Sequence, residues 1–374
     1  MAEVTTGAVT AVGQPPGVDS ESTSGNPQQP SPEQRRQARS RLEGAIRSVV
    51  GIVLILLQLN VFYDSAAVLQ VVVTLLGFFG IATGLSLLIS GFLGAKTDAG
   101  AVLSAVWLVI VLLFVFAQLF GFHNSLEADF ANREQPPKFT TDEPLGTDQL
   151  GKSILAQVIR GARVSLLVGV GAVSLGMVVG TVLGMAAGYF RGPIEGGFNV
   201  FTDAILAFPA LILLFSIVAI FGGGGGSTSE VLKITLALAV LSVPTIGRLA
   251  RANTLTFAAR EFVTAAKAMG AKSSRILFRE IMPNVALPLA SYAFIVVAVF
   301  IVAEASLSFL GVGIDPITSP TWGNMISDGR DPKLLEEAPH IVFVPGVLMF
   351  LTVLSLNRIG ETLRAYWDPR EANL

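Results

Sequence analysis

The stretch Glu261-Phe-Val-Thr-Ala-Ala-Lys-Ala-Met-Gly270 decides how this sequence is interpreted. It begins a charged island between long apolar runs, and the island continues to Arg279-Glu280-Ile-Met-Pro283-Asn284. Helical spacing places four of its residues on one face of a helix: Glu261, Thr264, Ala265 and Ala268. The short side chains of Ala265 and Ala266 allow another surface to approach the backbone closely.

Gly270 stands where this helix is expected to end, in the left-handed conformation that glycine adopts at little cost. Ser273 or Ser274 is expected to cap a second short helix, which carries Arg275 and which Pro283 should end or kink. The pattern predicts a helix–glycine–helix hairpin that docks on another surface. The alternative is an ordinary charged loop between membrane helices.

Composition indicates an all-α, polytopic membrane protein. Mean hydropathy is +0.66, 52% of residues are hydrophobic and only 14% are charged, whereas soluble domains carry about 25% charged residues. The chain has no cysteine, which excludes disulfides and thiolate chemistry. Its two histidines, His123 and His340, are far apart, so no zinc site is expected. The net charge of −2 gives no sign of a nucleic-acid partner.

Crossing a bilayer takes about 20 apolar residues, and runs of this kind predict about eight spans. We place them at residues 46–63, 67–94, 101–121, 164–188, 199–221, 231–252, 283–306 and 340–358. Both termini are then cytoplasmic, and most of the 25 Lys and Arg residues lie on the cytoplasmic side, as the positive-inside rule requires.

The expected organisation follows from these spans. It consists of a disordered cytoplasmic tail over 1–45, an N-terminal transmembrane segment of about three spans over 46–121, an extracytoplasmic linker over 122–162, a transmembrane domain over 163–360 that contains the charged island at 253–284, and a cytoplasmic tail over 361–374. The protein is therefore expected to be a multi-pass component of the plasma (inner) membrane, in contact with membrane lipid.

The charged island closely resembles the EAA loop of ABC-transporter permeases. That loop has an acidic residue, paired alanines, a glycine four residues later and an apolar-proline ending, as in Glu261, Ala265-Ala266, Gly270 and Ile281-Met-Pro283. The resemblance implies that Glu261, Ala265, Ala266, Gly270, Arg275 and Pro283 insert into a groove on a separate ATPase subunit.

Further motifs resemble the dipeptide/oligopeptide/nickel importer permeases over residues 125–370. They include Pro144-Leu-Gly-Thr-Asp, Asp203-Ala-Ile-Leu-Ala-Phe-Pro209, Glu304-Ala-Ser-Leu-Ser-Phe-Leu-Gly and Trp322-Gly-Asn-Met. The resemblance implies a type I ABC importer permease fold. Most family members have one span before the linker, whereas this chain is expected to have three. The two extra spans keep the linker outside and the island inside.

One short motif points to a different class of protein. Gly146-Thr-Asp-Gln-Leu-Gly-Lys-Ser153 matches the P-loop pattern. A phosphate site needs a buried strand before the loop, and the residues before Gly146 are polar. We therefore expect a surface turn and a helix start, with ATP and magnesium bound by the partner ATPase subunits and no cofactor on this chain.

Three isolated residues are candidates for a pathway or gate: Glu304, Pro209 and Asp203. Glu304 lies near the outer end of a span, where a charge is tolerated and needs no function. Asp203 is expected to cap a helix, with an ion pair to a neighbouring loop as the alternative. Pro209 and Pro244 break helices beside a pathway or produce packing kinks. We find no constellation for catalysis, so the chain is not expected to be an enzyme.

The resemblance implies a permease subunit of an ATP-driven importer for peptides or similar small solutes. Its expected partners are a second permease, two ABC ATPase subunits and an extracytoplasmic solute-binding protein. The alternative is a non-transporting membrane scaffold or sensor that has kept the permease fold.

Overall fold

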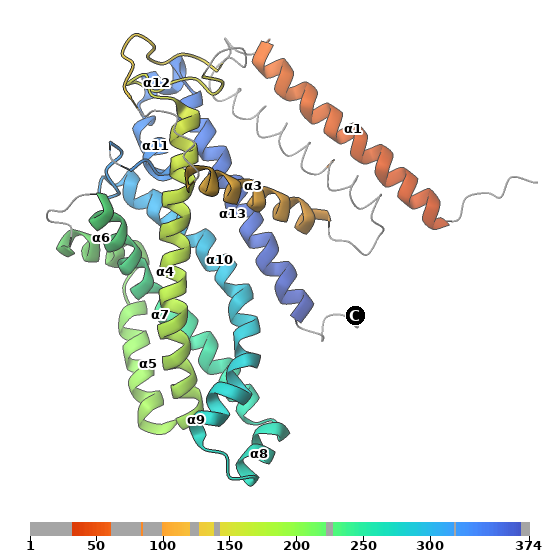
Figure 1. Ribbon diagram of the computed structural model, residues 1–374, viewed down its shortest axis with the longest axis vertical. Helices are drawn as coiled ribbons and strands as arrows, with labels where there is room; N and C mark the ends of the chain where they lie inside the picture. Colours follow the sequence, from red (N-terminus) through yellow and green to blue (C-terminus); the bar gives the residue numbers. More distant parts are fainter. Residues whose placement is uncertain are drawn as a thin grey trace, which may run out of the picture.

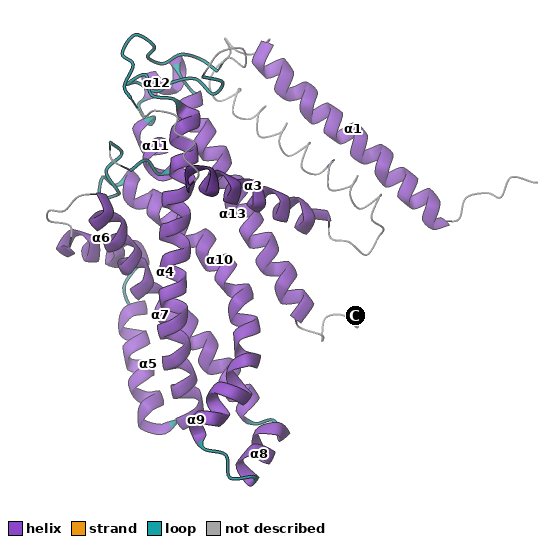
Figure 2. Cartoon of the chain, viewed as in Figure 1, coloured by secondary structure: helices purple, strands orange, loops and turns teal. Residues whose placement is uncertain are grey.

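The computed structural model describes residues 32–60, 84, 99–119, 127–137, 143–221, 227–317 and 319–367. This part of the chain is helical apart from connecting loops and one isolated β-bridge between Thr147 and Ser153 (Figure 1; Figure 2). The helices are α1 (Pro32–Asn60), α3 (Ala99–Leu119), α4 (Ile154–Phe190), α5 (Gly192–Leu206), α6 (Ala210–Phe221), α7 (Ser227–Ala258), α8 (Glu261–Ala268), α9 (Ser273–Arg275), the π-helix η1 (Ile276–Ile281), α10 (Met282–Phe309), α11 (Trp322–Asp328), α12 (Pro332–Glu337) and α13 (His340–Trp367).

The described residues contain four helices long and apolar enough to cross a membrane. These are α4, most of α7, the continuous helix from Ser273 to Phe309, and α13. The pair α5 and α6 makes a fifth if it is counted as one broken span. Apart from Gly84, the expected span at 67–94 lies outside the described residues, so a total of about eight remains a prediction.

Several helices extend beyond the boundaries expected from the sequence. Helix α1 begins at Pro32, within the expected disordered tail, and an Arg39–Glu43 ion pair of 3.0 Å one turn apart supports its polar start. Helix α4 begins at Ile154, inside the expected linker, and α13 reaches Trp367. Hydropathy locates only the apolar part of a helix. The helix itself extends beyond that part through polar turns at its ends.

Helices α4 and α7 pack together along most of their length. Glycines recur every fourth residue on the face of α4 that meets α7: Gly176, Gly180, Gly184 and Gly188. A Cβ atom added to Gly184 would lie 2.1 Å from the carbonyl oxygen of Gly247 on α7. Small residues at this spacing allow two membrane helices to approach through their backbones.

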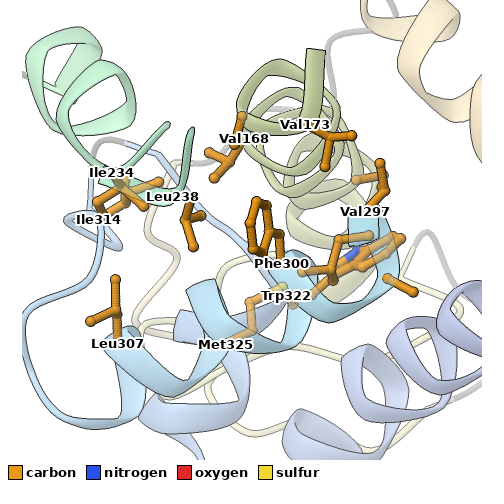
Figure 3. Close-up of a cluster of buried hydrophobic side chains, with 14 of the residues drawn as sticks. Val168, Val173, Ile234, Leu238, Val297, Phe300, Leu307, Ile314, Trp322 and Met325 are labelled. Atoms are coloured by element: carbon orange, nitrogen blue, oxygen red, sulfur yellow. The ribbon is translucent and has the colours of Figure 1, made fainter. Parts of the chain in front are cut away.

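The main hydrophobic core lies where α4, α7, α10 and α11 meet (Figure 3). Val168 of α4, Leu238 of α7 and Phe300 of α10 point into it, and Trp322 at the start of α11 is fully buried. In Figure 1, α11 and α12 lie at the top of the bundle and α8 and α9 at the bottom. We refer to these as the upper and lower ends.

Helix α3 packs against α13 and α4. The indole Nε1 of Trp107 donates a hydrogen bond of 3.1 Å to the hydroxyl of Thr352 on α13. The N-terminal segment is therefore joined to the bundle through α3.

Candidate functional site: the hairpin at the lower end of the bundle

The charged island forms a compact hairpin at the lower end of the bundle, which we call the docking hairpin (residues 261–281). It consists of α8, a turn at Gly270, α9 and η1. This confirms the helix–glycine–helix arrangement expected from the sequence.

One face of α8 packs against the protein itself. Val263 is fully buried and Ala266 is 5% exposed, and both belong to a cluster with Ile276 and Ile281 of η1. The cluster also includes residues of α4, α7 and α10: Met185, Ile246, Ala250, Val285 and Leu289. The hairpin is thus held by apolar contacts on the lower ends of α4, α7 and α10.

The opposite face of α8 is exposed and includes Glu261, Thr264, Ala265 and Ala268, as the helical spacing predicted. Phe262 and Met269 are also exposed, Met269 by 82%. Ala266, which the resemblance placed in the docking contact, faces the protein interior. The exposed face of α8 therefore combines apolar side chains with Thr264 and with two charged residues, Glu261 and Lys267.

Gly270 ends α8 in the left-handed conformation that was predicted, with φ of +78°. The Ala271 amide donates to the carbonyl of Ala266 and the Gly270 amide to that of Lys267, each at 3.0 Å. These two bonds form a Schellman motif, which requires a residue with positive φ after the helix. Nothing lies within 4 Å of a Cβ atom added at Gly270, so its backbone conformation is the reason for glycine there.

The second half of the hairpin differs from the expectation in two respects. Lys272 stands at the N-cap of α9, and neither Ser273 nor Ser274 caps it. Of the two outcomes expected at Pro283, an end of the helix is excluded, because the helix continues from Ser273 to Phe309 without a break, and a kink stays a prediction. Proline lacks the amide hydrogen that the interior of an α-helix requires. The wider π-helical turns of η1 lie directly before Pro283. Arg275 and Pro283 are both exposed.

Charged contacts tie the lower ends of the neighbouring helices together. The Lys267 ammonium lies 5.5 Å from the centre of the Tyr189 ring at the end of α4. Arg251 of α7 pairs with Glu195 of α5, and both side chains are about three-quarters buried. The sequence analysis did not identify this pair, because it joins segments that are 56 residues apart.

Asp203 does not cap a helix, contrary to expectation. It lies in the last turn of α5 and forms an ion pair with Arg248 of α7. The sequence had left an ion pair open as the alternative, but with a residue of a neighbouring loop and not of a helix. Pro209 stands at a break of 88° between α5 and α6, so the expected span at 199–221 is not one straight helix. Pro244, by contrast, lies inside the continuous helix α7.

Glu304 lies near the upper end of α10 and is fully buried. Its Oε1 accepts hydrogen bonds from Thr321 at 2.9 Å and from Ser308 at 3.1 Å. It therefore faces the interior of the protein and not an open mouth.

The P-loop match forms a turn that is filled by the chain itself. The Asp148 carboxylate accepts from the amides of Leu150 and Lys152, each at 2.8 Å, and from the side chain of Gln157 at 2.7 Å. Ser153 is the N-cap of α4. An acidic side chain thus occupies the place of a phosphate, as expected for a surface turn. The described residues include no group of three or more acidic, His or Cys residues that could hold a metal ion.

Comparison with known proteins places this geometry in a family. Residues 180–373 match the family described as binding-protein-dependent transport system inner membrane component. This region contains the docking hairpin, Glu304 and α13.

Named relatives cover more of the chain. The dipeptide transport system permease protein DppC of Alkalihalophilus pseudofirmus is 36% identical over 260 residues, which is 70% of this chain and 82% of the relative. The di/tripeptide permease DppC of Pseudomonas aeruginosa is 36% identical over 277 residues, covering 71% and 88%. The glutathione transport system permease GsiD of Pectobacterium atrosepticum is 36% identical over 226 residues, covering 60% and 72%.

A solved inward-facing structure of the MetNI methionine ABC transporter covers 56% of this chain and 97% of its own, with 18% identity and a TM-score of 0.42. The assignment rests on the sequence relatives and on the family match, which favour transport over a non-transporting scaffold. This chain belongs to the binding-protein-dependent inner membrane component family and is a multi-pass permease subunit of an ABC importer, whose ATPase activity resides on separate subunits.

Proposed function

We propose that this chain is one of two permease subunits of an importer for short peptides, and that its docking hairpin binds an ATPase subunit. Peptide cargo is supported by the two relatives named as dipeptide and di/tripeptide permeases. The observation that carries the docking proposal is the two-sided α8, with Val263 and Ala266 in the bundle and Met269 exposed.

The orientation follows from charge. Basic residues gather at and beside the docking hairpin: Arg248, Arg251, Arg260, Lys267, Lys272, Arg275 and Arg279. Because basic segments stay on the cytoplasmic side, we place the lower end and both termini in the cytoplasm. The upper end then faces outward, where a solute-binding protein docks against residues 127–150 and 311–339.

The break between α5 and α6 supports a second permease. Phe208 is 59% exposed, and its neighbours Ala207 and Pro209 are also exposed. Non-helical backbone within a membrane needs cover from protein or a water-filled cavity. We therefore place the partner permease and the pathway along this break, with Pro209 and Asp203 beside it.

Transport follows as a change between two states. Closure of the ATPase subunits on ATP moves the docking hairpin, and the helix ends packed on it move as well. The bundle then switches access from the outer to the inner side.

Co-purification with the second permease and the ATPase subunits tests the docking role. Glu261→Lys reverses the charge at the edge of the exposed face, and Gly270→Pro removes the amide that closes the Schellman motif. We expect either variant to insert normally and to lose the ATPase subunits. Glu336→Lys, an equivalent change on exposed α12, should retain them. Recovery of the full complex with both hairpin variants would refute the role.

The cargo is tested separately. The reconstituted transporter, with its binding protein, should accumulate labelled dipeptide in an ATP-dependent manner. Uptake of nickel, but not of peptide or glutathione, would overturn the peptide assignment and leave the permease role intact.

A further inference from the structure

Glu304 is a buried acidic residue. No basic side chain of the described residues forms an ion pair with it. It is 0% exposed, and its buried Oε2 has no hydrogen-bond partner among the residues that the structure describes. Burying a carboxylate in this way is costly, and an ionisable residue inside a membrane bundle usually marks a function. The hydrogen bonds of its other oxygen indicate what that function is.

Glu304 connects α10 to the return segment, by which we mean the described residues 310–317 and 319–339 between α10 and α13. Its partner Thr321 is the N-cap of α11 and is itself buried. The Thr321 hydroxyl accepts from the amide of Asn324 at 3.1 Å, and the Asn324 side chain accepts from the amide of Thr321 at 2.8 Å. This capping box fixes the start of α11, so the carboxylate of Glu304 is bonded to an ordered point of the return segment.

The contacts around this bond join α11 to two long helices. The Trp322 indole donates to the carbonyl of Val158 on α4 at 3.1 Å, and its amide donates to the Ser165 hydroxyl at 3.3 Å. A Cβ atom added to Gly323 would lie 2.4 Å from the Cα of Ala305, the residue after Glu304. The return segment therefore rests on α10 with backbone-to-backbone contact at this level.

The same helix reaches the docking hairpin at its other end. One continuous helix runs from Ser273 to Phe309. Its first part, η1, packs against Val263 and Ala266 of α8 through Ile276 and Ile281. One continuous helix thus contacts the upper return segment at Glu304 and the lower hairpin at η1 (Figure 1).

We propose that Glu304 is a positioning residue that couples the return segment to α10, so that a binding protein docked at the upper end changes ATP hydrolysis at the lower end. The inference rests on the proposed function, because it takes the upper end as outer and the hairpin as the ATPase contact. Coupling between distant sites needs packed elements that move together, and the Glu304–Thr321 bond links two of them.

The chemistry of the site predicts how substitutions differ. Gln at position 304 keeps a carbonyl oxygen that accepts from Thr321 and Ser308. Glu304→Ala removes that acceptor, so the buried Thr321 hydroxyl loses the carboxylate oxygen to which it donates. Thr321→Val removes the same bond from the other side and also removes the hydroxyl that accepts from the Asn324 amide at the start of α11. The bond, and not the charge, is therefore expected to decide the coupling.

The test uses the assembled transporter in lipid nanodiscs, with ATPase activity measured with and without its substrate-loaded binding protein. We expect Glu304→Ala and Thr321→Val to leave basal activity within about twofold of the parent and to reduce stimulation by the binding protein at least about fivefold. Glu304→Gln should retain most of the stimulation. The double variant should be no worse than either single one. Ser306→Ala is the matched control, since this hydroxyl bonds back to Val302 of its own helix at 2.8 Å.

Undiminished stimulation in Glu304→Ala and Thr321→Val would overturn the inference. Equal loss of basal and stimulated activity would also overturn it, because that pattern indicates general damage to the fold. A parent complex that binds no ATPase would instead refute the proposed function, so the two failures are distinguishable.

Discussion

At the scale of single residues, glycines and buried polar groups define this structure. Gly270 is needed for its backbone conformation, whereas Gly184 is needed for the space it leaves at α7. The role of Gly270 was predictable from the sequence, because a helix end is a local event. The burial of Glu304 was not, because it depends on a return segment that folds back over α10. The glycines spaced by four on α4 were a visible signal that the sequence analysis did not use.

Gly184→Ala should destabilise the protein, because the new Cβ atom would lie 2.1 Å from a backbone oxygen of α7. Overpacking of this kind costs about 1–3 kcal/mol. Gly196→Ala is the matched control, since nothing lies within 4 Å of its added Cβ atom on α5. The thermal midpoint in detergent should fall for Gly184→Ala only. Equal midpoints for the two variants would contradict the close packing of α4 and α7.

Lys152→Ala should leave the ATPase activity of the assembled complex unchanged. The turn that matches the P-loop pattern has its amides bonded to Asp148, so no phosphate binds there. The measurement is steady-state ATP hydrolysis at saturating ATP. A loss of tenfold or more, as expected for a catalytic lysine, would restore the P-loop interpretation.

At the scale of elements, hydropathy predicted which segments are helical but not how they bend or end. The expected span at 199–221 is two helices, and Pro209 marks the break. Pro244 gave the same sequence signal and lies in an unbroken helix, because packing against α4 holds α7 together. A proline thus marks a possible break, and tertiary contacts decide whether the break occurs.

The contact between the α4 start and α11 should depend on pH. Partial burial, and then repulsion by Asp148, raise the pKa of Asp328 above its ordinary value, and Arg330 and Lys152 oppose this. An acid whose pKa is higher in the folded state binds its proton more tightly there. Stability is therefore lost as pH rises through the interval between the two pKa values and regained as pH falls.

Hydrogen exchange of residues 143–153 and 322–330 measures this effect. After correction for intrinsic rates, protection should be slightly greater at about pH 3.5, below the ordinary pKa of an aspartate, than at about pH 7.5. Asp328→Asn should remove the difference, while Glu336→Gln should not. The effect is small, because Asp328 remains exposed and solvent screens its charge. Greater protection at the higher pH would contradict the sign.

At the scale of the whole molecule, we propose a permease that couples an outer return segment to an inner docking hairpin. The membrane class and the hairpin were predictable, because each depends on local composition or spacing. The ion pair between Arg251 and Glu195 and the contacts of the return segment were not, since they join distant segments. The number of N-terminal spans remains a prediction. Of these segments, α3 packs on α13 through Trp107.

Cysteine cross-linking tests the central claim most directly. The natural chain has no cysteine, so a single one is a unique probe. Met269→Cys places it on the exposed tip of α8, and Ile317→Cys, at a residue 72% exposed, places it at the upper end. In the assembled complex, a short bifunctional reagent should join position 269, but not 317, to an ATPase subunit. Cross-linking of the ATPase at 317 and not at 269 would contradict the account.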